Sequence, residues 1–181
     1  MYMKKIFLIG FALSLYISGY SQLYMTRTGY IGFLSTASLE DIKADNNQVY
    51  AVIDAGKKEM AFTLLMKSFL FAKELQQEHF NENYAESDKY PKANFTGSYT
   101  GNVDLSKDGL YPVTVKGNLT IHGVTKPIET PATMEVRSGH LLGQCVFTIN
   151  LEDYNISIPA VVKDKIAKQV TITVKIDCTP K

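Results

Sequence analysis

The sequence predicts an all-β protein built from antiparallel strands, and three observations support this class. Apolar residues recur at every second position along most of the chain after residue 22, which is the period of half-buried strands. Val, Ile and Thr are frequent, and 11 Tyr and 9 Phe occur without any Trp, a composition that favours strands. Turn signals separate the alternating stretches at Asp108-Gly109, His122-Gly123 and Ser138-Gly139.

The N-terminal segment has the parts of a secretory signal peptide. Lys4 and Lys5 precede an apolar run over residues 6–17, and the small residues Gly19 and Ser21 follow. The run is shorter than the about 20 residues that span a bilayer. We expect cleavage after Ser21, which makes the mature protein periplasmic or secreted, without an integral membrane span.

The remaining residues, 22–181, are expected to form a single domain, because a chain of 181 residues has one domain by default. The 19 basic and 18 acidic side chains give a formal net charge of +1. This balance offers no basic surface for a polyanion, so nucleic acid is not an expected partner.

About eight strands are expected, the first near residues 30–34. The later strands carry their alternating apolar positions in the ranges 49–53, 60–66, 95–103, 113–121, 128–136, 141–151 and 170–178. The stretch 73–87 lacks β-branched residues and is rich in Glu, Gln and Asn, which predicts a helix that ends before Tyr90-Pro91. An irregular stretch at 152–168 is expected to hold a short helical turn after Pro159.

The alternation alone leaves two architectures open. The apolar faces pack on one another in a β-sandwich, whereas in a closed barrel they line one cavity. The main candidates for a channel lining belong to the inward-facing set: Phe62, Leu64, Met66, Phe95, Tyr99, Val113, Val115, Leu119, Met134, Phe147, Ile149, Ile172 and Val174.

Two stretches carry a family resemblance. HFNENYAESDKYPKANFTG (79–97) and VKGNLTIHGVTKPI (115–128) resemble the YceI-like family, a group of bacterial exported proteins with lipocalin-like, polyisoprenoid-binding barrels. The sequence is similar to the short form of the family, with Glu78-His79-Phe80 where other members have an Asp-X-His segment. The resemblance implies an eight-stranded antiparallel barrel with one short helix covering an end. It also implies an apolar channel for the tail of a quinone-like or polyprenyl lipid, and no catalytic residues.

Cys145 and Cys178 raise the question of a disulfide. Cys145 is in phase with Phe147 and Ile149, and Cys178 is in phase with Val174 and Ile176. If Ile149 lies opposite Val174 in an antiparallel pair, the two cysteines face each other, and an exported location permits oxidation. The alternative is two free thiols.

Candidate catalytic and metal-binding residues are few. His79, His122 and His140 do not have the spacing of a zinc site, so no metal and no cofactor are predicted. Glu78, Glu82 and Glu86 share a spacing of four residues and are expected on a solvated helix face. No nucleophile motif is present.

The sequence thus predicts a non-enzymatic lipid-binding protein that holds an isoprenoid or a similar amphiphile for transport or storage. One alternative is a structural or interaction module with a filled core and no ligand. Another is a hydrolase or isomerase acting on a lipid through Glu78, Glu82 or His79. Dimerisation through a barrel edge is left open.

Overall fold

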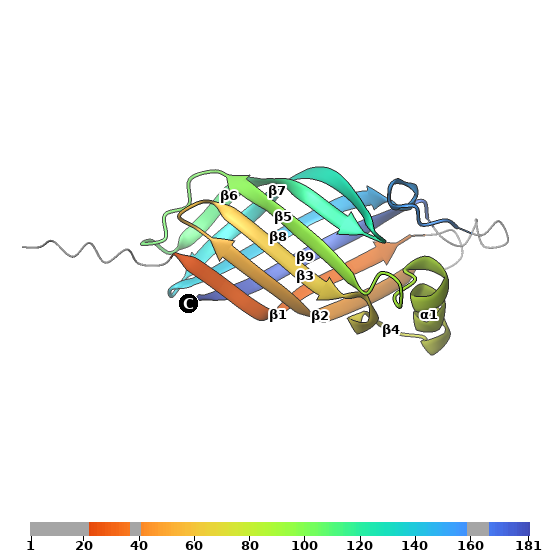
Figure 1. Cartoon of the computed structure of the whole chain (residues 1–181). Coiled ribbons are helices and arrows are strands. Elements are labelled where there is room, and N and C mark those ends of the chain that lie inside the picture. Colours follow the sequence, from red (N-terminus) through yellow and green to blue (C-terminus); the bar gives the residue numbers. More distant parts are fainter. Residues whose placement is uncertain (1–21, 37–40, 159–166) are drawn as a thin grey trace, which may run out of the picture.

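The computed structural model describes residues 22–36, 41–158 and 167–181, which form an antiparallel β-barrel (Figure 1). The predicted signal peptide and the predicted turn after Pro159 lie outside these residues. The elements in chain order are β1 (Leu23–Ser35), β2 (Ile42–Asp54), β3 (Glu59–Leu65), β4 (Leu70–Phe71), α1 (Glu74–His79), β5 (Lys92–Thr100), β6 (Gly109–Ile121), β7 (Val124–Arg137), β8 (His140–Asn150) and β9 (Gln169–Pro180).

Eight strands close the ring in the order β1-β9-β8-β7-β6-β5-β3-β2, and β2 pairs back onto β1. Because the sheet closes on itself, the architecture is a barrel rather than a β-sandwich. The predicted number of strands is confirmed. The two-residue strand β4 is additional, and it pairs with β2 through Ala44 and Phe71.

Two predicted boundaries differ from the structure. The first strand begins at Leu23 rather than near residue 30, because its first part pairs with the end of β2. Helix α1 ends at His79 and continues as a π-helical turn, Phe80–Tyr84, so the helical part is shorter than 73–87. A positive φ of 43° at Glu86 turns the chain away from the helical direction.

The predicted turns at residues 122–123 and 138–139 are confirmed as two-residue hairpin loops. Both loop residues have positive φ in each case, 52° and 73° in the first and 51° and 80° in the second. Two positive φ values define a type I′ turn, whose twist matches that of the flanking strands. These turns set the register between β6 and β7 and between β7 and β8.

The two ends of the barrel differ. The end that holds the chain's C-terminus is filled by a core in which Ile53, Leu141 and Cys178 are completely buried. At the other end α1 lies beside the barrel rim (Figure 1).

The predicted register between β8 and β9 is wrong by four residues, and with it the predicted facing of the two cysteines. Ile149 lies opposite Val170, Cys145 lies opposite Val174, and Cys178 lies opposite Leu141. Four residues separate the cysteines by about 14 Å along the strands, whereas a disulfide needs Cα atoms within about 7 Å. Both thiols are free. No tight turn joins β8 to β9, so turn chemistry could not reveal their register.

Candidate functional site

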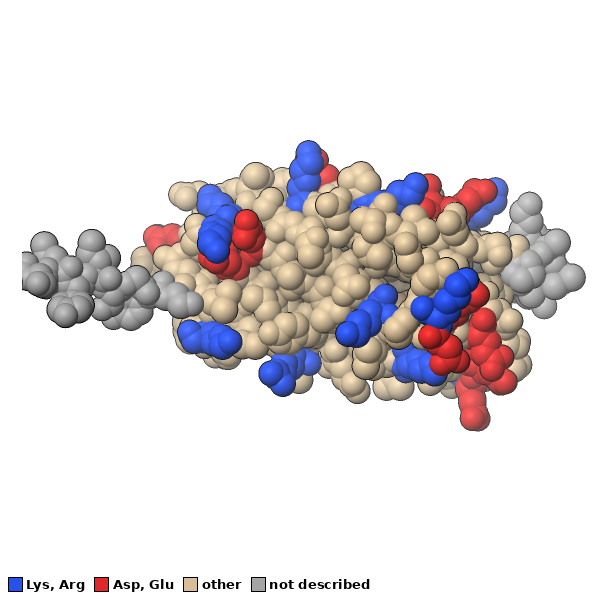
Figure 2. Space-filling model, in the orientation of Figure 1, with Lys and Arg blue, Asp and Glu red and all other residues tan. Residues whose placement is uncertain are grey.

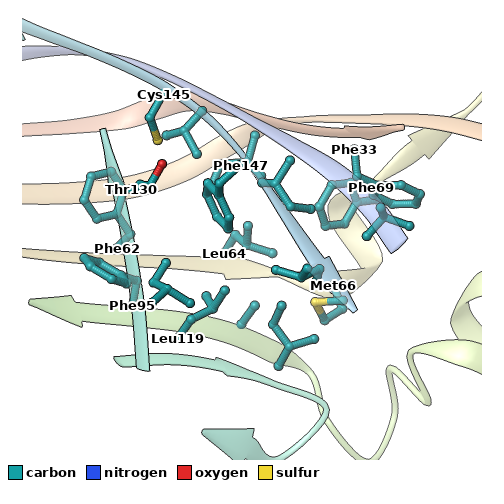
Figure 3. Close-up of a pocket in the computed structure, with 18 of the residues that line it drawn as sticks. Phe33, Phe62, Leu64, Met66, Phe69, Phe95, Leu119, Thr130, Cys145 and Phe147 are labelled. Carbon is teal, nitrogen blue, oxygen red and sulfur yellow. The ribbon is translucent and has the colours of Figure 1, made fainter. Parts of the chain in front are cut away.

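A cavity of about 540 Å³ lies inside the barrel, between the filled end and α1. Its volume falls within the range typical of ligand pockets. The pleat of the strands directs every second side chain inward. Figure 3 shows Leu64, Phe95, Leu119 and Phe147, each from a different strand, lining this space.

Eleven of the thirteen residues predicted to line a channel border the cavity. Tyr99 and Val113 do not border it and are buried in the filled end, with exposed fractions of 3% and 5%. The Tyr99 hydroxyl there donates to the backbone carbonyl of Ala55 at 3.4 Å. The alternation shows which face of a strand points inward, but not how far along the barrel the residue lies.

The cavity wall is apolar and uncharged. Among the described residues that border it, none is Lys, Arg, Asp or Glu. An isolated charge in such surroundings costs many kcal/mol, so the wall suits an uncharged apolar molecule.

Figure 3 shows two polar groups that face this interior, the Thr130 hydroxyl and the Cys145 thiol. Other uncharged polar residues border the cavity too: Ser35, Gln76, His79, Thr133 and Gln144. Thr130 is 5% exposed, and its hydroxyl donates to the carbonyl of Pro131 at 3.2 Å. Burial raises the pKa of Cys145 to about 11, which keeps the thiol protonated and unreactive at neutral pH. The prediction omitted Thr130, although it is in phase with Ile128 and Ala132.

Four phenylalanines that the prediction also omitted pack together at the α1 end of the cavity. Phe33 of β1 stacks on Phe80 with ring centroids 5.5 Å apart, and Phe69 and Phe71 contact both rings at 5.0–5.8 Å. This aromatic cluster joins the helical segment to the barrel. Phe33 is in phase with Ile31 on β1, so the alternation of apolar residues could have predicted that Phe33 faces inward.

The sequence matches the YceI-like domain over residues 26–178. The chain belongs to the YceI-like family. The match covers most of the chain and includes both stretches that carry the resemblance. No curated protein matches the sequence significantly.

Several solved structures share this YceI-like fold. A polyisoprenoid binding domain from Saccharophagus degradans, implicated in plant cell wall breakdown, superposes with a TM-score of 0.75 at 16% identity, covering 88% of this chain and 99% of that one. BcnA from Burkholderia cenocepacia gives 0.70 at 18% identity, with 83% and 96% covered. The YCEI protein of Campylobacter jejuni gives 0.57 at 16% identity, with 99% of each chain covered.

In this YceI-like barrel, His122 of the HGVTKP stretch holds neighbouring segments together. Its Nδ1 lies 3.1 Å from the carbonyl oxygen of Tyr154, and its Nε2 lies 2.6 Å from a carboxylate oxygen of Glu86. The Tyr90 ring packs edge-on against the imidazole at 4.4 Å. His122 therefore connects the β6–β7 turn to the segments that follow α1 and β8.

The other candidate ionisable groups do not assemble into a site. His140 contacts Asp177 at 2.7 Å near the surface, and His79 borders the cavity at the exposed α1 end. Acidic side chains gather over α1 in Figure 2, and Glu86 lies beyond the helix rather than on its face. Within the described ranges, no three His, Cys, Asp or Glu residues converge as metal ligands. No helix there is long and apolar enough to cross a bilayer.

Proposed function

We propose that this protein binds the apolar chain of an uncharged lipid in its barrel cavity, for transport or storage. The observation that carries the proposal is the uncharged apolar cavity of about 540 Å³. Each CH₂ group moved from water into such a site contributes about 0.8 kcal/mol, so a chain of several isoprene units has ample driving force.

The lipid class rests on the family and on the fold. The solved structure from Saccharophagus degradans is described as polyisoprenoid binding. We therefore propose an isoprenoid, quinone-like or polyprenyl, as the ligand. Its tail would lie among the eleven predicted residues that border the cavity. The proposed role is binding rather than catalysis, and the proposed location is the periplasm or the exterior, after removal of residues 1–21.

The direct test is lipid analysis of the full-length protein purified from its own host without detergent. Organic extraction followed by mass spectrometry should release an isoprenoid in near-stoichiometric amount. Native mass spectrometry of the same sample reports the ligand mass and the assembly state together. An empty protein that also fails to take up a polyprenol or a quinone from vesicles would refute the proposal.

A further inference from the structure

The barrel wall is unpaired along one flank of the cavity. Strands β7 and β8 pair from Arg137–His140 only as far as Ala132 and Cys145. Beyond that point, residues 124–131 of β7 and 146–150 of β8 form no pairs with each other, although β7 remains paired with β6 up to Val124. We call this stretch the β7–β8 gap.

Two prolines explain where the pairing stops. Residues that flank a two-residue hairpin turn form a hydrogen-bonded pair, and such pairs recur at every second position. The turns at both ends of β7 therefore direct the N–H groups of its odd-numbered residues toward β8. Pro127 and Pro131 belong to this set and have no N–H to donate. The β7–β8 ladder ends at Ala132. The next residue along it is Pro131, which has no N–H group to donate to β8.

The β7–β8 gap runs alongside the cavity. Ile128 and Thr130 on β7, and Phe147 and Ile149 on β8, border both the gap and the cavity. Val146, at the start of the unpaired part of β8, points outward and is 58% exposed. This flank of the cavity thus lacks a hydrogen-bonded ladder along residues 124–131 of β7 and 146–150 of β8.

The segment 151–156 bounds the gap on the α1 side. Its 3₁₀ turn, Leu151–Tyr154, packs Tyr154 into a small core with Ile149 and Val170. The contact between His122 Nδ1 and the Tyr154 carbonyl holds this segment to the β6–β7 turn. Ile121 and Val124 of the β6–β7 hairpin pack against the same core, so side-chain packing and one side-chain hydrogen bond hold the segment there in place of a strand ladder.

The two barrel ends offer more resistance to a chain. One end is filled by the buried core, and at the other end the aromatic cluster of Phe33, Phe69, Phe71 and Phe80 must separate. Resting on the proposed function, we infer that the lipid chain enters and leaves the cavity sideways, through the β7–β8 gap. A long lipid tail can then enter the cavity sideways over its whole length. It does not have to pass end-first through one end of the barrel.

A reversible staple across the gap tests this route. Glu129→Cys and Thr148→Cys place two outward-facing thiols on opposite sides of the gap, in a protein whose two native thiols are protonated and react slowly because of burial. A reductant-cleavable bis-maleimide joins them. The probe is a fluorescent, uncharged farnesol ester supplied from phosphatidylcholine vesicles. The staple should slow both loading and release about tenfold or more, because the flank can no longer open, and reductant should restore both rates.

The matched control keeps Glu129→Cys and pairs it with Lys116→Cys across the closed β6–β7 wall. Lys116 and Glu129 form an exposed ion pair at 3.2 Å, so the control staple spans a position where the strands are already joined. It should change neither rate by more than about twofold, because that wall does not open. Equal effects of the two staples, or no effect of either, would overturn the sideways route. So would a gap staple that weakens equilibrium binding without slowing release. If the unsubstituted parent protein binds no probe at all, the proposed function itself fails.

Discussion

On the outer face of the barrel, the Tyr30 hydroxyl donates a 2.6 Å hydrogen bond to Asp45 and ties β1 to β2. This bond, helped by partial burial, raises the pKa of Tyr30 to about 12. The same bond, with a smaller contribution from Lys43, lowers the pKa of Asp45 against the opposing effect of burial. Folding therefore favours a neutral Tyr30 and an ionised Asp45. The stabilisation is present at neutral pH. It is lost as pH rises from about 10 towards 12, and again as pH falls through the lowered pKa of Asp45.

Tyr30→Phe removes this bond and should lower the free energy of unfolding by about 1 kcal/mol at pH 7. The variant should also lose less stability than the parent between pH 10 and 12, because it lacks the titrating hydroxyl. Urea unfolding at several pH values measures both effects. Tyr50→Phe, on the neighbouring strand and without a comparable hydroxyl contact in the structure, serves as the control. A parallel alkaline decline in parent and Tyr30→Phe would contradict the assignment.

The two cysteines provide a second prediction at this scale. Burial raises the pKa of Cys145 to about 11 and that of Cys178, with a smaller contribution from Asp177, to about 12. At pH 8 only about one Cys145 thiol in a thousand is ionised, so iodoacetamide should react very slowly with the folded protein. In denaturant without reductant, mass spectrometry should show two added groups. A denatured protein that takes up no group would demonstrate a disulfide.

Among the elements, strands β5 and β6 approach closely where Gly97 faces Gly117. A Cβ added to Gly97 would collide first with the backbone carbonyl oxygen of Lys116, and would lie 2.7 Å from both the Cα of Gly117 and the tip of the Phe95 ring. The facing backbone and the Phe95 ring, which borders the cavity, therefore together fill the space that side chains at both glycines would need. Because Gly97 and Gly117 have no side chains, they leave room for the Phe95 ring in the barrel wall.

Gly97→Ala should consequently lower the free energy of unfolding by about 1–3 kcal/mol, because the new methyl group overpacks the wall against the β6 backbone and the Phe95 ring. Gly109→Ala, on the end of β6, is the control, since its Cβ would meet only Tyr111 at 3.5 Å, an ordinary contact. Chemical denaturation compares the two variants. If Gly97→Ala is as stable as Gly109→Ala, the close approach is not a constraint.

Much of the element order follows from local rules. The strand faces follow from the period of two, and both type I′ turns follow from a residue that tolerates positive φ next to glycine. Helix α1 is shorter than its composition suggests, because helix propensity does not locate the point where the chain must turn back to β5. Pro127 and Pro131 were visible signals that the part of β7 before Ala132 could pair on only one side, and the strand prediction did not use them.

At the scale of the whole molecule, the barrel is filled over one part of its length and hollow over the other. Val113 and Val115 lie on the same face of β6, yet Val113 is buried in the filled core and Val115 borders the cavity. A step of two residues along β6 therefore leads from a position in the packed core to a position at the cavity.

This division predicts opposite effects for one substitution at the two positions. Val113→Phe should lower the free energy of unfolding by about 1–3 kcal/mol through overpacking. Val115→Phe should cost less than about 1 kcal/mol, because the ring has free volume to enter, but it should weaken binding of a fluorescent prenol about tenfold by occupying the site. Thermal unfolding and a binding titration of both variants provide the comparison. Equal destabilisation with unchanged binding would mean that the cavity is not the ligand site.

The strand content, the inward face of each strand and two of the turns could be predicted from the amino-acid sequence, because they depend on the alternation of side chains and on local φ preferences. The sequence also contained the family motifs that imply a barrel. The register of β8 against β9, the depth at which Tyr99 and Val113 lie, and the gap beside Pro131 became visible with the folded barrel. These features depend on which residues that are far apart in the chain come into contact when the barrel closes. Such long-range contacts produce no local sequence pattern.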